Sequence, residues 1–279
     1  MQQTKQMELS IREIQEISLE ILHTIANICE EQHFRYALIY GTLIGAVRHH
    51  GYIPWDDDVD IMMPRPDYDR LLGYLKLHIQ EYPNLRVFNR EECSEYPYMI
   101  TRISDERYII KMENEKPFGM GVFIDIYPYD GLGNTKEEAV KYGLKGDRLS
   151  SFCYQATRDH FAMETTTSII RKIVKFPVFI YAKLRGKEYF QNKLDKLARV
   201  KEYDSSEYVG CVIWLSWGEK DIFPRKWFDE TILMPFDKYE FRVPKYYDEV
   251  LRHEYGDYMQ LPPEKDRVGH HFFKVYKKK

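Results

Sequence analysis

The chain of 279 residues has only four cysteines, and no two of them form a CxxC pair. They lie scattered at Cys29, Cys93, Cys153 and Cys211, which argues against a disulfide framework and against a zinc site. An excess of basic residues is also missing, because 41 Lys and Arg stand against 44 Asp and Glu. Bulk binding of nucleic acid needs such an excess and is not expected, so anionic partners must be met by local patches.

Long apolar runs are absent as well. No stretch approaches the roughly 20 apolar residues that span a bilayer. The first ten residues lack the apolar core of a secretion signal. We therefore expect a cytoplasmic protein. Apolar residues still make up 44% of the chain, which is enough for a packed core.

Hydrophobic spacing divides the chain into three parts. In 1–34, isoleucines at three- and four-residue steps predict an amphipathic helix that packs on the core. Residues 35–134 mix short apolar runs with helical patterns, which predicts an α+β core with a mixed sheet. Residues 135–279 are predicted to be largely helical after a cap at Thr135, and to complete a substrate cleft.

Several local features can be predicted inside these parts. We expect strands over 36–40, 85–88, 98–103, 108–112, 122–127 and 209–215, with 98–103 and 108–112 forming a hairpin. Thr42 is expected to cap a short helix over 43–49, and Asp67 a helix that runs to about Glu81.

The most informative pattern is Asp58-Val59-Asp60-Ile61. Alternation along a strand places Asp58 and Asp60 on one face and the two apolar side chains on the other. Two neighbouring carboxylates repel each other unless a cation lies between them. Oxygen ligands suit Mg²⁺ or Mn²⁺ better than zinc, so a metal site that also holds substrate phosphates is predicted.

Two further features fit such a site. Gly41-Thr42 follows a short apolar run and precedes a helical pattern, which is typical of a turn that presents backbone N–H groups to a phosphate. Asp125 is a charged residue inside an apolar strand, where it is expected to bind the metal or to act as a general base. The alternatives are a solvated acidic turn at 56–58 and an Arg partner for Asp125.

Cationic candidates for binding phosphate lie nearby in the sequence. Arg48 follows the glycine turn and is able to clamp a phosphate with two hydrogen bonds. Arg102 and Lys111 are weaker candidates of the same type, and a surface ion pair is the alternative for Arg48. The adjacent His270 and His271 are predicted to contact phosphate.

Three sequence blocks resemble the LicD family. They are Tyr40-Gly-Thr-Leu-Ile-Gly-Ala-Val-Arg-His-His-Gly-Tyr-Ile-Pro-Trp-Asp-Asp-Asp-Val-Asp-Ile61, Phe123-Ile-Asp-Ile-Tyr-Pro-Tyr-Asp-Gly131 and Tyr255-Gly-Asp-Tyr-Met-Gln-Leu-Pro-Pro263. The resemblance implies a nucleotidyltransferase fold, distantly related to fukutin. It also implies transfer of phosphocholine from CDP-choline to a sugar hydroxyl of a cell-surface glycan precursor, of teichoic acid or lipopolysaccharide type, with release of CMP.

The resemblance also implies roles for single residues. Asp58 and Asp60 correspond to metal ligands, Asp125 to the third acidic residue, and Gly41 with Thr42 to the phosphate-side turn. It does not decide which CDP-alcohol is the donor. The alternatives are transfer of an NMP group to a small alcohol or antibiotic, transfer of another CDP-linked alcohol phosphate, and a catalytically inactive scaffold.

A quaternary ammonium headgroup would need an aromatic box, since it cannot donate a hydrogen bond. Trp214, Trp217, Trp227 and Tyr154 are candidates, with core packing as the alternative for each. Residues 168–187 mix bulky apolar side chains with six Lys or Arg and no acid. This composition suits peripheral contact with an anionic membrane that carries a lipid-linked acceptor, or else a core helix with a basic edge.

Overall fold

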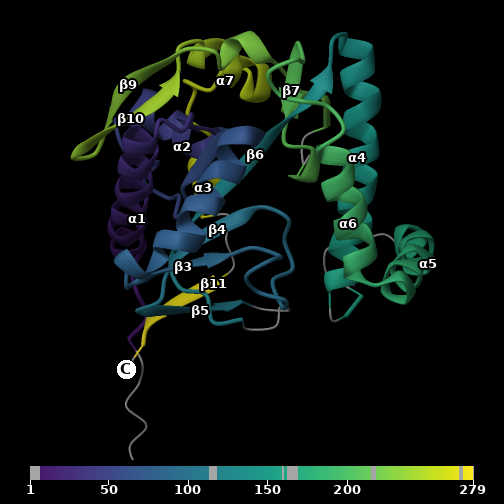
Figure 1. The fold of residues 1–279 in the computed structure, drawn as a ribbon. Helices are drawn as coiled ribbons and strands as arrows, with labels where there is room; N and C mark the ends of the chain where they lie inside the picture. The colour runs from purple at the N-terminus through teal and green to yellow at the C-terminus, as the bar shows by residue number, and fades with distance from the viewer. Residues whose placement is uncertain are drawn as a thin grey trace, which may run out of the picture.

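The structure is a computed structural model that describes residues 7–112, 118–158, 160–161, 169–214, 218–269 and 273–278. Within these residues, a mixed sheet of seven strands forms the centre (Figure 1). Its strands are β1 (Ala37–Leu38), β2 (Asp60–Pro64), β3 (Leu85–Phe88), β4 (Thr101–Asp105), β6 (Phe123–Gly133), β7 (Tyr208–Gly210) and β8 (Phe223–Pro224). The expected combination of helices with a mixed sheet is therefore confirmed.

The strand order is β1-β2-β6-β4-β3, and β7 joins β6 further along the same strand. β2 and β6 run parallel, whereas the other neighbours are antiparallel. The parallel register sets Asp60 beside Asp125, and the next strand sets Arg102 on the other side of Asp125. Partners in register lie on one face of a sheet, so these three polar side chains form a row across β2, β6 and β4.

Helices lie on both sides of this sheet (Figure 1). They are α1 (Ile11–Gln32), α2 (Tyr40–Ile44) with a π-helical turn (Gly45–His49), α3 (Arg65–His78), α4 (Lys136–Thr157), α5 (Ile169–Arg185), α6 (Lys187–Ala198) and α7 (Tyr247–Tyr255). The predicted isoleucine stripe of α1 is confirmed, because Ile14, Ile21, Ile25 and Ile28 are buried and Ile17 packs, partly buried, against the core. The predicted cap of α4 is also confirmed, since the Thr135 hydroxyl accepts a hydrogen bond from the Glu138 N–H.

Two smaller sheets complete the fold. β9 (Thr231–Phe236) and β10 (Tyr239–Pro244) form a hairpin, and β5 (Tyr108–Met112) pairs with β11 (Phe273–Lys277). The hairpin expected between 98–103 and 108–112 is therefore wrong. β4 is buried along its whole length, and both of its edges are taken by β3 and β6, so no edge remains for β5.

Neither Thr42 nor Asp67 caps its helix as expected. α2 already begins at Tyr40, and the Thr42 hydroxyl accepts a hydrogen bond from the Asp60 N–H at 2.8 Å. α3 begins at Arg65, and the carboxylate of Asp67 binds Arg35 at 2.6 Å. Both side chains thus join segments that are distant in the sequence instead of satisfying the N–H groups of their own helix.

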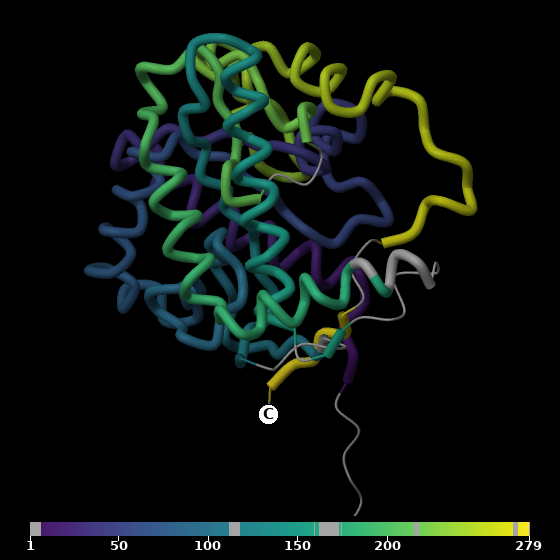
Figure 2. The backbone as a smooth tube through the Cα atoms, turned by 90° about the vertical axis from the view of Figure 1, so that its right-hand side faces the viewer, coloured from purple at the N-terminus to yellow at the C-terminus, as the bar shows by residue number. Residues whose placement is uncertain are grey.

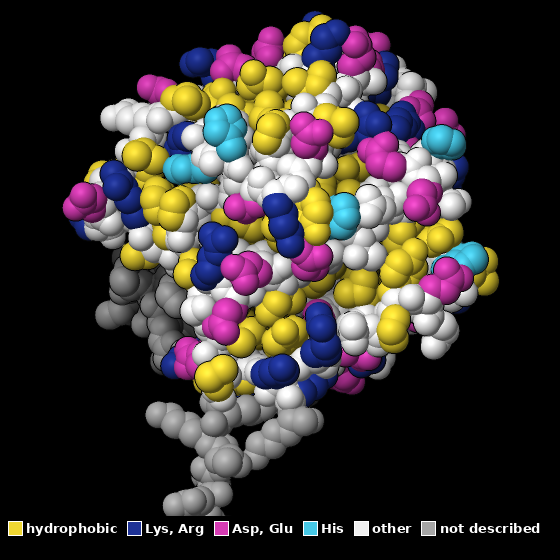
Figure 3. Space-filling view, turned by 90° about the vertical axis from the view of Figure 1, so that its left-hand side faces the viewer, with side chains coloured by type: hydrophobic (Ala, Val, Ile, Leu, Met, Phe, Trp, Pro, Cys, Tyr) yellow, Lys and Arg dark blue, Asp and Glu magenta, His cyan; other side chains and the backbone are white. Residues whose placement is uncertain are grey.

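The remaining views show how the outside is arranged. Figure 2 faces the α4–α6 side and shows the segment 257–268 arching away from the end of α7. Figure 3 shows the opposite side of the molecule, where acidic and basic side chains are interspersed. The expected strand over 209–215 is shorter than predicted, because β7 ends at Gly210 and a 3-10 turn (Val212–Trp214) comes after it.

Candidate active site

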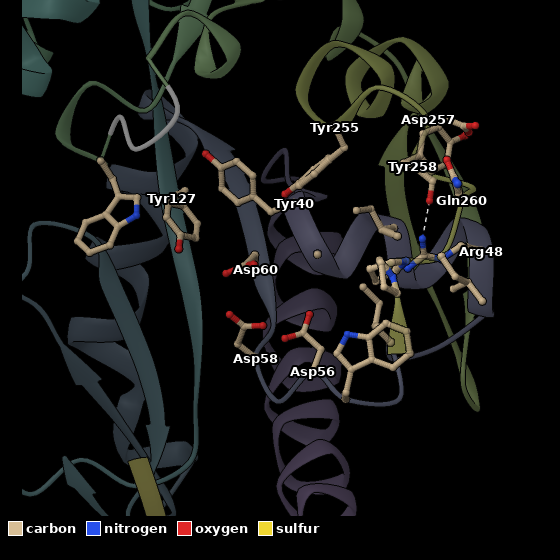
Figure 4. Close-up of a pocket in the computed structure, with 18 residues that line it drawn as sticks. Tyr40, Arg48, Asp56, Asp58, Asp60, Tyr127, Tyr255, Asp257, Tyr258 and Gln260 are labelled. Atoms are coloured by element: carbon tan, nitrogen blue, oxygen red, sulfur yellow. Dashed lines mark hydrogen bonds between the residues drawn. The ribbon is translucent and has the colours of Figure 1, made fainter. Parts of the chain in front are cut away.

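A cavity of about 770 Å³ lies beside the start of β2 (Figure 4). Its walls come from α2 and the turn after it, from the segment that leads into β2, from β6, and from the segment after α7. The lining residues are Tyr40, Gly41, Ile44, Arg48, Ile53, Trp55, Asp56, Asp58, Asp60, Tyr127, Trp214, Tyr255, Asp257, Tyr258, Gln260, Leu261, Pro262 and Pro263. This size suits a nucleotide-sized or drug-sized ligand.

Three carboxylates, from Asp56, Asp58 and Asp60, face this cavity together (Figure 4). Asp58 and Asp60 are brought into one site, as the sequence predicted, while Val59 between them is fully buried. Asp60 is buried too, and its Oδ1 atom has no hydrogen-bond partner among the described residues. Burial raises the pKa of Asp60 well above its usual range, and the negative charges of Asp58, Asp125 and Asp56 raise it further.

Backbone contacts fix Asp60 in place. Its N–H donates to the Thr42 hydroxyl, and its carbonyl oxygen accepts from the N–H of Ile39 at 3.2 Å. Gly41 is required for a different reason: a Cβ atom at this position would lie 2.8 Å from Oδ2 of Asp56. The Gly41-Thr42 turn therefore shapes the acidic site directly. Gly41 leaves room for the carboxylate of Asp56, and the Thr42 hydroxyl positions Asp60.

The side chains present fit a hard dication. The unpartnered Oδ1 of Asp60 and the mutual repulsion of three carboxylates both call for a positive charge, and all the donor atoms are oxygens. In the part of the chain that the structure describes, no group of three or more Asp, Glu, His or Cys side chains is arranged to hold a metal ion by itself. Such an open set is typical of magnesium sites, in which substrate phosphates and water complete the coordination.

Arg48 supplies a positive charge to the cavity. Its Nη1 donates to the backbone carbonyl of Tyr258, and its Nε donates to His49 at 2.9 Å. Within the described residues it forms no ion pair, and burial lowers its pKa. A half-buried guanidinium without a carboxylate partner is suited to binding a phosphate of the ligand, which stays a prediction for Arg48.

Asp125 and Arg102 form an ion pair with each other. The sequence predicted instead that Asp125 binds the metal or acts as a base and that Arg102 binds phosphate. Nε of Arg102 lies 2.6 Å from Oδ1 of Asp125, both residues are buried, and neither lines the cavity. The Asp125 charge raises the pKa of Arg102 well above its usual range, against the effect of burial. Arg102 is thus engaged by a carboxylate of the protein itself, while Asp125 stays next to Asp60 through the strand register.

Six aromatic side chains form much of the cavity wall. They are Tyr40, Trp55, Tyr127, Trp214, Tyr255 and Tyr258. The rings of Tyr40 and Tyr127 meet edge to face, with centroids 5.1 Å apart. Tyr40 also holds a positive φ of 53°, a conformation that costs about 1 kcal/mol or more in a residue with a side chain. The fold thus holds this ring against the cavity at some cost in stability.

Among the predicted aromatic candidates that the structure describes, Trp214 alone lines the cavity. Tyr154 lies on α4 with the guanidinium of Arg158 over its ring at 4.0 Å, and Trp227 packs on Phe223. Lys111 lies on β5 against Tyr276. The predicted candidates Trp217, His270 and His271 lie outside the described residues.

Sequence reasoning missed most of the aromatic wall. Tyr40, Trp55 and Tyr255 lie inside the LicD-like sequence blocks, and Tyr127 follows Asp125 by two residues on the same strand face. Their position beside acidic residues in those blocks was the available signal. The sequence pattern places Asp56 only in an acidic turn, although its carboxylate faces the cavity with Asp58 and Asp60 (Figure 4).

Comparison with known proteins adds independent information. Residues 33–148 match a family sequence model described as LicD/FKTN/FKRP, nucleotidyltransferase domain. The chain is 31% identical over 274 residues to the lipopolysaccharide cholinephosphotransferase LicD of Haemophilus influenzae (strain ATCC 51907 / DSM 11121 / KW20 / Rd). That alignment covers 96% of this chain and 98% of the relative.

Proposed function

This chain belongs to the LicD family, and we propose that it transfers phosphocholine from CDP-choline to a sugar hydroxyl of a cell-surface glycan precursor. The observation that carries the proposal is the composition of the cavity. It combines the carboxylates of Asp58 and Asp60, the guanidinium of Arg48 and six aromatic rings. A donor with a diphosphate, a quaternary ammonium and a nucleoside needs these three kinds of group.

The reaction breaks one bond and forms one. The acceptor hydroxyl oxygen attacks the phosphorus that carries choline, and the bond from this phosphorus to the bridging oxygen breaks, so that CMP leaves with the bridging oxygen. The hydroxyl proton passes to one of the cavity carboxylates, those of Asp56, Asp58 and Asp60. In this proposal the base is a cavity carboxylate, because Asp125 is already bound by Arg102.

Asp58 and Asp60, with Asp56 beside them, would hold Mg²⁺ or Mn²⁺. A bound dication would neutralise charge on the diphosphate and on the departing CMP. Arg48 orients a phosphate by hydrogen bonds from its guanidinium, and the aromatic rings line the cavity beside it. Positioning and electrostatics carry most of the catalysis in phosphoryl transfer.

The aromatic wall is the proposed binding site for the choline headgroup. A trimethylammonium group lacks N–H donors, so it is held by the negative faces of rings and by nearby carboxylates. Tyr127 lies on one side of the three carboxylates and Tyr255 on another (Figure 4), and Trp214 also lines the cavity. We expect Trp214→Leu to raise the KM for CDP-choline about tenfold with little change in kcat.

The control for that variant is Trp227→Leu, because Trp227 lies outside the cavity lining. It is expected to leave the KM for CDP-choline unchanged. Equal effects of the two substitutions on the KM for CDP-choline would show that the aromatic wall does not bind the choline headgroup. In that case a different CDP-alcohol should be the better donor in a panel of CDP-choline, CDP-ethanolamine, CDP-glycerol and CDP-ribitol.

The direct test follows the leaving group. The purified protein is incubated with CDP-choline, Mg²⁺ and lipopolysaccharide that lacks phosphocholine, and CMP is measured. We expect CMP to form and phosphocholine to appear on the glycan, with both products lost in Asp58→Asn. Release of pyrophosphate from CTP on transfer to a small alcohol, without CMP from any CDP-alcohol, would overturn the proposal in favour of NMP transfer.

A further inference from the structure

The helix α5 carries an apolar stripe that remains largely exposed, although the ring of Phe161 contacts Phe176 with centroids 5.4 Å apart. The stripe consists of the exposed side chains Ile173 (67% exposed), Phe176 (49%), Ile180 (41%) and Leu184 (83%). Steps of three, four and four residues place these side chains on one face of the helix. Four bulky apolar side chains on one exposed face form a patch that calls for a partner.

The other face of α5 is already used by the fold. Phe179 and Ala182 are buried, and Tyr181 meets Phe152 of α4 with ring centroids 5.7 Å apart. α5 lies at the outer edge of the helical part, beyond α4 and α6 (Figure 1). The stripe is therefore a second apolar surface, distinct from the one that attaches the helix to the protein.

The charged residues within α5 are all basic. From 165 to 187 the sequence contains six Lys or Arg and no acid. Lys183 and Lys187 donate to backbone carbonyls of Ala156 and Ser94, whereas Lys175 is exposed and Arg185 lies over the ring of Tyr181 at 5.7 Å.

The opposite side of the molecule, with α1, differs in this respect. There acidic and basic side chains are interspersed and pair with one another, as in Glu20–Lys238 and Glu30–Arg242 (Figure 3). An apolar stripe flanked by cations matches an anionic lipid surface, which offers both an apolar boundary layer and negative headgroups.

We propose that α5 docks this protein on an anionic lipid bilayer, with the helix lying in the plane of the interface. The stripe of Ile173, Phe176, Ile180 and Leu184 enters the boundary between headgroups and acyl chains, while Lys175 and Arg185 contact the headgroups. No helix in the described part of the chain combines the length and apolar composition needed to cross a membrane. Docking of this kind is peripheral and reversible.

The proposal extends the proposed function, because it supplies a reason for α5 to lie where it does. Figure 2 shows α5 below the segment 257–268, several residues of which line the cavity. A bilayer that meets α5 would bring membrane lipids to the protein. An acceptor carried on a lipid would then be held close to the protein, which raises its effective concentration there.

The test is co-sedimentation of the full chain with vesicles at low salt. One set is phosphatidylcholine alone, and the other is an equal mixture of phosphatidylcholine and phosphatidylglycerol. We expect binding to the anionic set only, and about tenfold weaker binding for Ile180→Gln combined with Leu184→Gln. Lys175→Gln combined with Arg185→Gln should weaken binding about tenfold, and added salt should do the same.

The matched control is Leu77→Gln, another exposed leucine on a helix, at 78% exposure on α3. It should bind anionic vesicles as the unmodified chain does. Failure of the unmodified chain to sediment with anionic vesicles would overturn the proposal. So would a dimer in light scattering that dissociates in the Ile180→Gln, Leu184→Gln variant, because a second copy of the chain would then cover the stripe.

A second readout separates this proposal from the proposed function. CMP release from CDP-choline, measured with a water-soluble acceptor, should be the same in the α5 variants and in the unmodified chain. Absence of CMP in every sample, together with normal vesicle binding, would reject the transfer reaction and leave the docking surface standing. Loss of CMP release in the α5 variants alone, with a soluble acceptor, would show that α5 serves the cavity and not a membrane.

Discussion

The guanidinium of Arg102 on β4 binds the carboxylate of Asp125 on β6, with Nε and Oδ1 2.6 Å apart and Nη2 and Oδ2 3.4 Å apart. Both residues are buried, and Arg102 also lies over the ring of Phe123 at 4.1 Å. Arg102, Asp125 and Asp60 lie side by side on the neighbouring strands β4, β6 and β2, with Arg102 at one end of this row. Asp125 therefore presents its negative charge to Asp60 while its own oxygens are bound by Arg102.

Breaking this pair is predicted to destabilise the fold. Asp125→Asn or Arg102→Met leaves one buried charge without its partner, which costs about 3–5 kcal/mol of unfolding free energy. The double variant should lose less than the sum of the two, because neither charge then remains. Urea unfolding of the four proteins measures this coupling. Additive losses would show that the two side chains do not depend on each other.

Part of this architecture follows from local sequence. The isoleucine steps of α1, the Thr135 cap and the alternation around Val59 are properties of neighbouring residues, and the structure confirms each of them. Asp58 and Asp60 meet at one cavity for the same reason, since only one residue separates them.

Other features depend on pairing between distant segments. The Arg102–Asp125 contact requires the register of β4 on β6, and the hydroxyl of Thr42 reaches a strand that begins 18 residues later. The aromatic wall joins α2, β6 and the segment after α7. Periodicity does not encode which strand lies beside which, so the prediction of a helix cap at Thr42 from its neighbours alone is wrong.

Asp60→Asn is predicted to separate catalysis from stability. Loss of its charge should reduce the rate of CMP release about a thousandfold, since the dication site loses a ligand. The unfolding free energy should stay equal or rise, because Asp60 is a buried carboxylate with an unpartnered Oδ1 that is repelled by Asp58, Asp125 and Asp56. Calorimetric titration with Mn²⁺ and urea unfolding measure the two effects. Unchanged Mn²⁺ affinity in the variant would show that Asp60 is not a ligand of the metal.

Thr42→Val is predicted to act on the same carboxylate from a distance. The substitution removes the hydroxyl that accepts from the Asp60 N–H, so this buried donor loses its partner at a cost of about 1–3 kcal/mol. CMP release should fall while the KM for CDP-choline changes little. Thr42→Ser keeps the hydroxyl and should restore most of the activity. Equal activity in the Val and Ser variants would show that this bond does not position Asp60.

Gly41→Ala is predicted to impair activity more than folding. The new Cβ would lie 2.8 Å from Oδ2 of Asp56, a side-chain atom that is able to rotate away. Gly45→Ala is the contrasting variant, because its Cβ would lie 2.5 Å from the backbone oxygen of Gly51. Gly45→Ala should therefore lower the melting temperature clearly, and Gly41→Ala only slightly. Full CMP release by Gly41→Ala would show that the position of Asp56 does not matter for the reaction.

Glu254 on α7 is predicted to make the stability of the fold depend on pH. Its carboxyl is fully buried, and both oxygens lack hydrogen-bond partners among the described residues. Burial together with the charge of Asp221 raises its pKa to about 9, while Tyr255 and Lys220 act in the opposite direction. The ordinary pKa of a glutamate, which applies to the unfolded chain, is 4.5. Between pH 4.5 and about pH 9, Glu254 is therefore protonated in the folded state and ionised in the unfolded chain.

Because the folded state binds more protons in that range, raising the pH lowers the unfolding free energy there, by at most about 1.4 kcal/mol per pH unit for one group. Glu254→Gln removes the titrating carboxyl, so its advantage in stability over the unmodified chain should grow from about pH 6 to about pH 9. Glu249→Gln, an exposed position on the same helix, should show no such growth. Urea unfolding of the three proteins at both pH values measures the difference, and parallel pH dependence of Glu254→Gln and the unmodified chain would mean that Glu254 is ionised within the folded protein.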